Sequence, residues 1–186
     1  MKSPFKNIGI VTRPNTPEIQ DTVHTLVSFL RENGFTIYLD ELSVEEHCVY
    51  IQDSAYCEIV NKAQLGKYCD LVVVLGGDGT FLYAGRALIA RQIPLIGIHT
   101  GRLGFLTDLT LADIDSGLDH ILSGAYHREE RHTLHVTVDT RDGSYEHTAI
   151  NDAVIHSSKA RMIELDVYTH ARHLSHYRAD GLIIAT

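Results

Sequence analysis

Cysteine is scarce in this chain of 186 residues, which has only Cys48, Cys57 and Cys69. No two of them have C-x-x-C spacing, and an odd number of thiols cannot pair completely. These absences argue against a disulfide framework and against a zinc site. We therefore expect reduced thiols.

Long hydrophobic runs are also absent. The longest wholly apolar run, Leu71 to Leu75, is far too short to cross a bilayer. The N-terminal segment MKSPFKNIGIVTRP has no signal-peptide core. We therefore expect a cytoplasmic protein with no membrane partner.

Basic residues are outnumbered. Lys and Arg total 16 against 24 Asp and Glu, so the formal net charge is -8, with twelve histidines that can offset it at mildly acidic pH. A general nucleic-acid surface needs clustered Lys and Arg, so we expect no nucleic-acid partner. Hydrophobic residues make up 44% and charged residues 22%, a composition that permits a folded core.

Strand and helix patterns alternate over residues 1–126. Short apolar runs predict strands at 7–12, 35–40, 70–75 and 93–98. Helices are predicted from Thr16-Pro17 to Gly34, over 80–92 and over 111–124, whereas the polar segment 43–67 indicates only helical pieces and a loop. Alternating β-α units of this kind predict a doubly wound α/β domain, which is expected to bind nucleotide.

The pattern changes to period two over residues 127–186, and Arg141-Asp142-Gly143 is a hairpin signal. The last residues, DGLIIAT, resemble a strand at whose end the sequence stops. About sixty residues of this kind would leave an unpaired edge and uncovered apolar surface. We therefore expect an incomplete β-rich second domain, and a chain that is a fragment.

A glycine-rich segment, LGGDGT, follows the apolar run directly. Gly76, Gly77 and Gly79 fall where a strand passes into a helix, and positive φ angles there would bring N–H groups close to phosphate oxygens. Asp78 would repel a phosphate unless it faces a hydroxyl to be deprotonated or a metal ion. The alternative is a tight turn in which Asp78 caps the helix, and the spacing alone leaves both open.

Four segments in order carry a resemblance. GGDGT, GIHTGRLGFLTD (Gly97 to Asp108), AINDAVIH (Ala149 to His156) and YRADGLIIAT (Tyr177 to Thr186) together resemble the NAD kinase family over nearly the whole chain. GGDGT alone is shared with diacylglycerol and sphingosine kinases and is similar to the phosphofructokinase loop. The family continues with a Thr-Gly-Ser-Thr-Ala-Tyr segment that completes its NAD site, and this chain ends just before it.

The resemblance implies transfer of the γ-phosphate of ATP, or of polyphosphate in some members, to the 2′-hydroxyl of the adenosine ribose of NAD. It implies Mg²⁺, for which we assign no protein ligand, and a homodimer or homotetramer. Asp78 would be the base, and Gly76, Gly77, Gly79 and Thr80 would lie at the nucleotide.

The resemblance also assigns residues outside the glycine loop. Phe105 would line or support the pocket, although core packing explains it nearly as well. Asn151 and Asp152 match the family's Asn-acid pair that holds the adenosine of NAD, with Asp152 where many relatives have glutamate. The alternative for this pair is an ordinary bulge or turn. Three further residues match positions that contact the dinucleotide: Arg161, Arg178 and Asp180.

Two other functions stay open from the sequence. One is a diacylglycerol-type lipid kinase domain, which LGFLTD and AIND argue against, and the other is a non-catalytic dinucleotide-binding fragment. A metal site at His170, His173 and His176 is disfavoured, because residues three apart on a strand face opposite sides and no Cys or carboxylate set joins them. We expect a solvated strand or turn there, without zinc.

Overall fold

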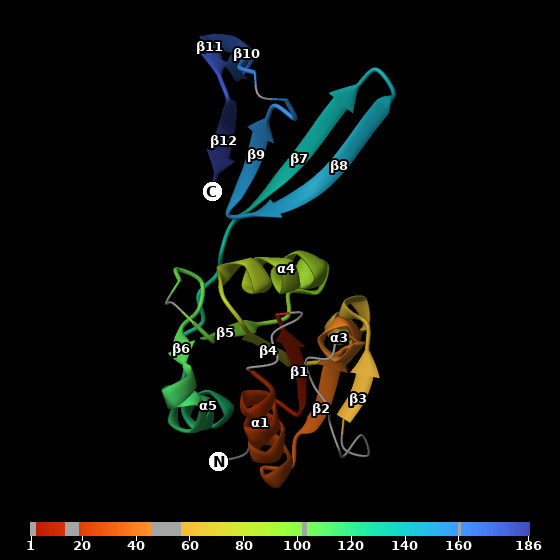
Figure 1. Ribbon diagram of the computed structural model, residues 1–186, viewed down its shortest axis with the longest axis vertical. Coiled ribbons are helices and arrows are strands. Elements are labelled where there is room, and N and C mark those ends of the chain that lie inside the picture. Colours follow the sequence, from red (N-terminus) through yellow and green to blue (C-terminus); the bar gives the residue numbers. More distant parts are fainter. Residues whose placement is uncertain (1–2, 14–18, 46–56, 102–103, 160) are drawn as a thin grey trace. The chain divides into compact units, whose positions relative to one another are not determined.

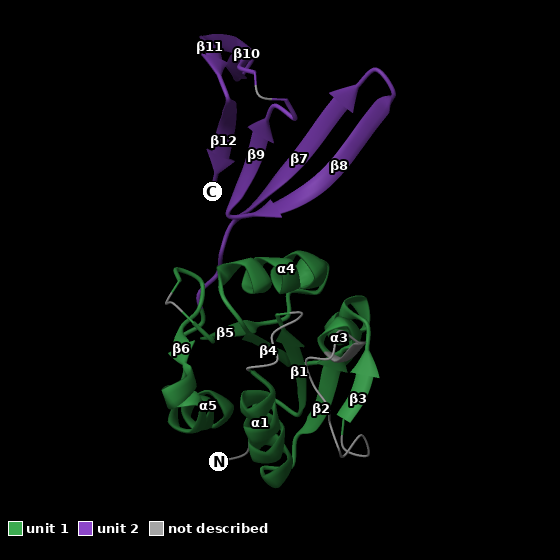
Figure 2. Ribbon diagram, in the orientation of Figure 1, with its two compact units in different colours: residues 1–128 green, residues 129–186 purple. Residues whose placement is uncertain are grey.

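The computed structural model describes residues 3–13, 19–45, 57–101, 104–159 and 161–186. It divides into two compact units, residues 1–128 (unit 1) and 129–186 (unit 2) (Figure 2). The sequence predicted a boundary between residues 126 and 127. Each unit is described below by itself.

Unit 1 is a parallel sheet with helices on both faces (Figure 1). Over the described residues the sheet has six strands in the order β3-β2-β1-β4-β5-β6. The strands are β1 (Asn7–Thr12), β2 (Thr36–Asp40), β3 (Cys57–Val60), β4 (Leu71–Leu75), β5 (Leu95–His99) and β6 (Leu109–Thr110). The helices are α1 (Gln20–Glu32), α2 (Glu41–Glu45), α3 (Lys62–Tyr68), α4 (Asp78–Leu88) and α5 (Ile114–Leu122), with short 3₁₀ turns at Ile89–Arg91 and Leu111–Asp113.

Strand β4 shows how the two faces are built. Its alternate residues Leu71, Val73 and Leu75 pack in one buried cluster with residues of α1 and α5, whereas Val72 and Val74 pack in another with residues of α3 and α4. Because side chains alternate across a strand, both sets can be apolar only when helices cover both faces. The doubly wound α/β fold predicted from the sequence is confirmed.

Most predicted elements of unit 1 form. The glycines predicted to end helices, Gly34 and Gly124, have φ angles of 79° and 95°, the left-handed conformation that glycine adopts easily. The prediction of only helical pieces and a loop over 43–67 was wrong in part, because β3 lies there and pairs in parallel with β2. Thr16-Pro17 and Cys48 lie outside the described residues.

Unit 2 consists of antiparallel pairs, as the period-two pattern predicted. Its strands are β7 (Thr133–Thr140), β8 (Gly143–Ile150), β9 (Asp152–His156), β10 (Ile163–Thr169), β11 (Arg172–Ala179) and β12 (Gly181–Ala185). They form the pairs β7-β8, β9-β12 and β10-β11. The hairpin predicted at Arg141-Asp142-Gly143 is present, with Gly143 at φ 145°.

The second hairpin corrects the expectation for the histidines. His173 Nε2 and His176 Nδ1 lie 3.3 and 3.0 Å from the same oxygen, Asp166 Oδ1. A register shift between Val167 and Tyr168 breaks the alternation of β11, so the two histidines share a side. The prediction that they face opposite sides was therefore wrong, whereas the expected solvated strand or turn is confirmed, since both side chains are about half exposed.

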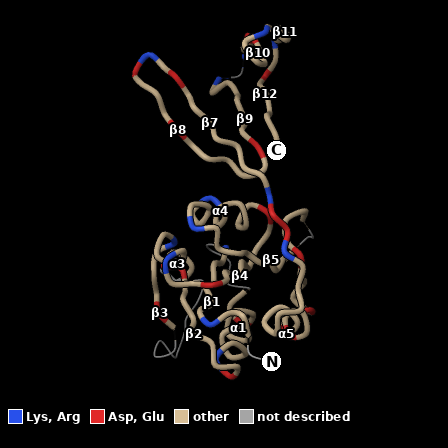
Figure 3. The backbone as a smooth tube through the Cα atoms, turned by 180° about the vertical axis from the view of Figure 1, so that it is seen from behind, with Lys and Arg blue, Asp and Glu red and all other residues tan. Residues whose placement is uncertain are grey.

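Charged residues and cysteines can be placed in the described part of the chain. Lys and Arg are interspersed with Asp and Glu along the backbone (Figure 3). No described helix has the length and apolar character that a bilayer-crossing helix requires. The described cysteines, Cys57 and Cys69, are free and buried, and burial raises their thiol pKa values to about 11 and about 12.

Candidate active site

The sheet of unit 1 changes its winding direction between β1 and β4. From β1 the chain moves outward to β2 and β3, and then returns to place β4 on the other side of β1. Open parallel sheets bind ligands at the carboxyl ends of the strands that flank such a point. Arg13 follows β1 there, and the glycine-rich segment follows β4, with the Arg13 N–H donating to Leu75 O at 3.1 Å.

The glycine turn leaves the start of α4 uncapped by any side chain. Gly76 N–H donates to Ile98 O at 3.0 Å, and Gly77 is the N-cap residue of the helix, with no side-chain capping bond. The first N–H groups of a helix have no acceptor within it, so they can bind an anion. The alternative in which Asp78 caps the helix is wrong, because Asp78 is the first helical residue.

The positive φ angles predicted for this turn are also not found. The described glycines with positive φ are Gly34, Gly124 and Gly143, and Gly77 is extended at φ -97°. Lack of space explains one of the loop glycines, Gly76, instead. A Cβ on Gly76 would lie 2.7 Å from Thr80 Cβ, whereas a Cβ on Gly77 or Gly79 would meet no atom within 4 Å. Gly76 is therefore needed for packing, and Gly77 and Gly79 leave the turn open.

The carboxylate of Asp78 binds the segment after β5. Its Oδ2 accepts the N–H of Phe105 at 2.9 Å, and its Oδ1 accepts the N–H of Leu106 at 3.0 Å. A Cβ on Gly104 would collide with all three carboxylate atoms, so only glycine allows this approach. The paired GGDGT and LGFLTD segments thus meet through Asp78, and each oxygen keeps further lone-pair capacity for a ligand.

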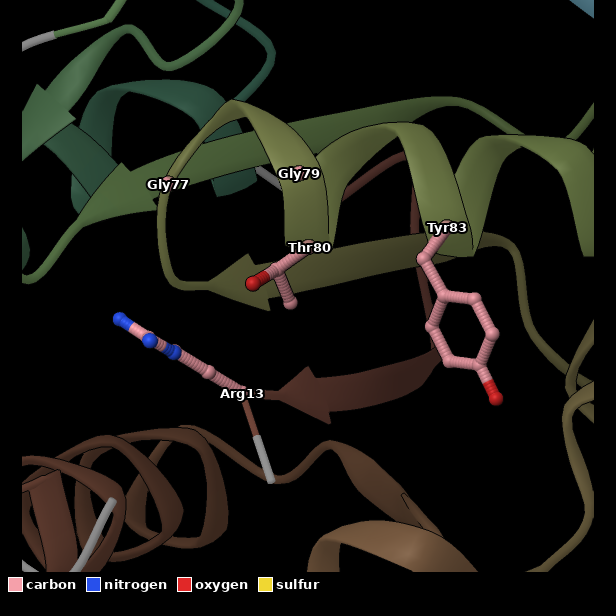
Figure 4. A pocket seen from close by; sticks show the side chains of 5 residues that line it. All are labelled: Arg13, Gly77, Gly79, Thr80 and Tyr83. Atoms are coloured by element: carbon pink, nitrogen blue, oxygen red, sulfur yellow. The ribbon is translucent and has the colours of Figure 1, made fainter. Parts of the chain in front are cut away.

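A pocket of about 540 Å³ lies beside this turn (Figure 4). The described residues that line it are Arg13, Gly77, Gly79, Thr80 and Tyr83. Thr80 is 9% exposed, and its side chain projects with the Arg13 guanidinium into the space under the first turn of α4. Sequence reasoning missed Arg13 and Tyr83, because a charged residue at a strand end and a tyrosine in a helix form no motif.

The backbone N–H of Phe105 belongs to this site because it binds Asp78, whereas the residue is 96% exposed. Core packing, the alternative given for Phe105, is therefore wrong. The adjacent Leu106 is 8% exposed and fixes the segment in unit 1.

In unit 2, Asn151 links β8 to β9 as a single residue with φ 74°, a left-handed conformation that asparagine tolerates better than most residues. Its Nδ2 donates to Asp152 Oδ2 at 2.7 Å, and its carbonyl accepts the N–H of Thr186 at 3.0 Å. The pair thus forms a turn whose amide and carboxylate are already oriented toward each other.

The remaining predicted residues do not gather around that turn. The backbone carbonyl of Asp180 accepts the N–H of Ser157 at 3.3 Å, at the end of the β9-β12 ladder opposite to Asp152. At about 3.3 Å per residue the two ends are about 13 Å apart. Arg178 pairs across β10-β11 with Glu164, and Arg161 is exposed between β9 and β10.

The described residues supply no metal centre of their own. No group of three or more His, Cys, Asp or Glu side chains among them has the geometry to hold a metal ion. Each oxygen of Asp78 accepts one backbone N–H group, so Asp78 is the single carboxylate at this turn with a lone pair to spare on each oxygen. One carboxylate does not form a protein-held Mg²⁺ site by itself.

Comparison with known proteins identifies a family for this arrangement. A protein-family model described as "ATP-NAD kinase N-terminal domain" matches residues 8–126 of this chain. These residues include all of β1 except Asn7, the glycine turn, Asp78 and the segment that Asp78 binds.

Several proteins are similar over the whole chain. A protein named NAD kinase from Neisseria gonorrhoeae (strain NCCP11945) is 50% identical over 188 residues, covering 100% of this chain and 64% of that protein. NAD kinase from Marinomonas sp. (strain MWYL1) is 39% identical over 185 residues, covering 98% and 61%. The chain therefore spans less than two thirds of the length of these curated relatives.

A solved structure shares the fold. The crystal structure of yeast NADH kinase complexed with NADH superposes with a TM-score of 0.84 at 20% sequence identity. The match covers 99% of this chain and 58% of the yeast protein.

Proposed function

The chain belongs to the ATP-NAD kinase family, and on that premise we propose that the protein transfers the γ-phosphate of ATP to the 2′-hydroxyl of the adenosine ribose of NAD, giving NADP and ADP. The observation that carries the proposal is the position of Asp78. Its carboxylate lies at the first turn of α4 and binds the segment 104–106, and its two neighbours Gly77 and Gly79 line the pocket.

The donor phosphates are proposed to lie against the uncapped start of α4. The free N–H groups of the first turn and the positive end of the helix attract an anion, and the Arg13 guanidinium adds a permanent positive charge. Gly77 and Gly79 allow the backbone to approach the phosphate closely because they have no side chain.

Asp78 is proposed to accept the proton of the ribose hydroxyl. As the bond between that oxygen and the γ-phosphorus forms, the bond to the β-phosphate oxygen breaks, ADP leaves, and the proton passes to the carboxylate. The N–H groups of Phe105 and Leu106 fix the orientation of the carboxylate, so little reorganisation is needed during the transfer.

NAD is proposed to bind through unit 2, which holds the Asn151-Asp152 turn. The amide offers a donor and an acceptor to an adenine edge, and the carboxylate can accept from ribose hydroxyls. Arg161, Arg178 and Asp180 are proposed as further dinucleotide contacts.

Three further properties are proposals that rest on the family. Mg²⁺ is proposed to arrive as part of the Mg·ATP donor and to neutralise the phosphate charge there. The protein is proposed to form a homodimer or homotetramer, which sedimentation velocity tests. It is proposed to act in the cytoplasm, which fractionation of cells tests.

The activity has a direct test. The protein is incubated with Mg·ATP and NAD, and NADP is measured with an NADP-specific dehydrogenase. We expect NADP and ADP in equal amounts. If no NADP forms while a lipid alcohol such as diacylglycerol becomes phosphorylated, the proposal is wrong. Bound NAD without any turnover would instead indicate a dinucleotide-binding module.

A further inference from the structure

A buried ion pair lies next to Tyr83, one of the residues that line the pocket. Lys62 Nζ is 3.3 Å from Asp40 Oδ2, and these side chains are only 9% and 2% exposed. The same ammonium lies 3.4 Å from the centroid of the Tyr83 ring. Asp40 ends β2, Lys62 begins α3 and Tyr83 belongs to α4, so three elements meet at this ring.

Helix stability does not explain the lysine. Lys62 is the first residue of α3, next to the positive end of the helix, where a cation is unfavourable. Burial adds a desolvation penalty, which the Asp40 carboxylate offsets. The arrangement fixes an ammonium group against one face of Tyr83, and a cation on an aromatic face is attracted to it.

Tyr83 is also one of the residues that line the pocket. The tyrosine is 38% exposed and lines the pocket, whereas Lys62 is not among the described residues that do so. In Figure 4 the ring extends from the helical turn that follows Thr80. The pocket thus has a cationic end at Arg13 and an aromatic end at Tyr83, four residues along α4 from Gly79.

From this geometry we infer that Tyr83, which has the Lys62 ammonium on one face of its ring, is the platform on which the base of the proposed nucleoside triphosphate donor stacks. The inference rests on the proposed function, because it concerns the donor of the same reaction. Tyr83 determines which donor is accepted, and it takes no part in the chemical step.

The chemistry of the ring separates the two donor classes. The face of an aromatic ring carries partial negative charge, so it repels a chain of phosphates and offers that chain no apolar contact. A purine base stacks on such a face, and loss of one stacking partner weakens binding by about 5- to 150-fold. Because Lys62 fixes the ring, little ordering is required when the base binds.

The test compares ATP with inorganic tripolyphosphate by calorimetric titration of the protein. Tyr83→Leu should weaken ATP binding at least about fivefold and leave tripolyphosphate binding unchanged, whereas Tyr83→Phe should bind both as the parent does. Tyr68→Leu is the matched control: Tyr68 is 36% exposed, has the Lys67 ammonium 5.2 Å from its ring centroid, and does not line the pocket. Equal losses for both ligands, or no loss of ATP binding, would overturn the inference.

A second variant covers the case in which Tyr83→Leu does not fold. The sequence has no tryptophan, so Tyr83→Trp places a single tryptophan at the platform. ATP should quench its fluorescence at saturation, and tripolyphosphate should not. An unchanged signal at saturating ATP would contradict base stacking. These binding results are independent of NADP formation, so failure of the proposed function and failure of this inference give different outcomes.

Discussion

The two units of the chain differ in how they bury apolar side chains. In unit 1 helices cover both faces of the sheet, and all the buried hydrophobic residues in the described part of the chain belong to this unit. In unit 2 the described strands form separate two-stranded ladders, and large apolar side chains such as Ile183 and Leu174 are 65% and 63% exposed. The difference indicates that the packed core of unit 1 can hold side chains in fixed positions. The described strands of unit 2 bury fewer side chains, so they hold their residues less firmly.

The largest expected effects are kinetic, and they differ between the units: a variant in unit 1 should lose kcat, whereas a variant in unit 2 should lose affinity for NAD. Asp78→Asn should lower kcat by about 10²- to 10⁴-fold, because an amide cannot accept the hydroxyl proton. Asp152→Asn should instead raise the KM for NAD by about tenfold with kcat retained. Steady-state kinetics of NADP formation measure both.

Asp78→Asn also changes the support of the loop. Asparagine offers one acceptor oxygen, so one of the two N–H groups of Phe105 and Leu106 loses its partner, at a cost of about 1–3 kcal/mol in unfolding free energy. Asp119→Asn, an exposed acid on α5, is the control and should change neither stability nor kcat. An unchanged kcat in Asp78→Asn would remove this residue from the catalytic role.

The next effect compares core packing in the two units. Leu75→Ala should reduce the free energy of unfolding by about 2–5 kcal/mol, because Leu75 is fully buried in the main cluster. Ile183→Ala should change it by less than about 0.5 kcal/mol, because Ile183 is mostly exposed. Urea denaturation monitored by circular dichroism measures both. Equal losses would contradict the contrast in burial.

Within unit 1, two neighbouring glycines should respond differently. Gly76→Ala should destabilise the fold by about 1–3 kcal/mol, because its Cβ would overlap Thr80. Gly77→Ala should leave stability nearly unchanged, because its Cβ meets no protein atom within 4 Å. It should weaken ATP binding, because Gly77 lines the pocket in which the donor phosphates are proposed to bind. Thermal unfolding and calorimetric titration give the two readouts. Equal stability of the two variants would contradict the packing role of Gly76.

In unit 2 we expect a smaller effect, a gain in folding stability, from a substitution at the tip of the β10-β11 hairpin. His170 and Ala171 both have positive φ, at 48° and 61°, as a two-residue hairpin turn of type I′ requires. Ala171→Gly should stabilise the protein by about 1 kcal/mol, because glycine adopts this conformation without strain. A rise in the urea midpoint checks this, and a fall would contradict the turn geometry.

The smallest effects are pH slopes of opposite sign in the two units. Burial raises the pKa of Asp40 above its ordinary 3.8, with Lys62 acting against this. The folded state then holds the proton more tightly, so stability falls as pH rises from about 3.8 through the raised value. Hydrogen bonds from His176 and His173 lower the pKa of Asp166, so its contribution is present above 3.8 and is lost as pH falls through the lowered value.

Urea midpoints of Asp40→Asn and Asp166→Asn, measured against the parent from about pH 3 to about pH 6, separate the two contributions. The urea midpoint of Asp40→Asn relative to the parent should rise with pH, because the parent loses the contribution of Asp40. The urea midpoint of Asp166→Asn relative to the parent should fall with pH, because the parent gains the contribution of Asp166. Slopes of the same sign would contradict the assignment of a buried carboxylate in unit 1 and an exposed one in unit 2.

The sequence predicted the elements whose pattern is local. β1, β4 and β5 are short apolar runs, and a strand buried on both faces requires such a run. β3 was missed because its four residues include Glu58 in an exposed position, and its pairing with β2 is a tertiary contact. The register shift in β11 was missed for the same reason, since strand alternation contains no sign of an extra residue.

The site was predictable only where a motif carried it. The glycine turn and the position of Asp78 followed from GGDGT, but the contact of Asp78 with the N–H groups of Phe105 and Leu106 depends on a fold that brings β4 next to β5. Arg13 and Tyr83 become part of the pocket through the same topology. The positive φ predicted for the turn glycines was wrong because the requirement there is space, which only the neighbouring atoms reveal.

Hydrogen exchange with and without Mg·ATP tests most directly the proposal that the donor phosphates bind at the start of α4 in unit 1. We predict slower exchange for the amides of residues 77–81 when ATP is bound, with the amides of residues 129–186 unchanged. Slowing confined to residues 129–186, or no slowing at all at saturating ATP, would contradict it.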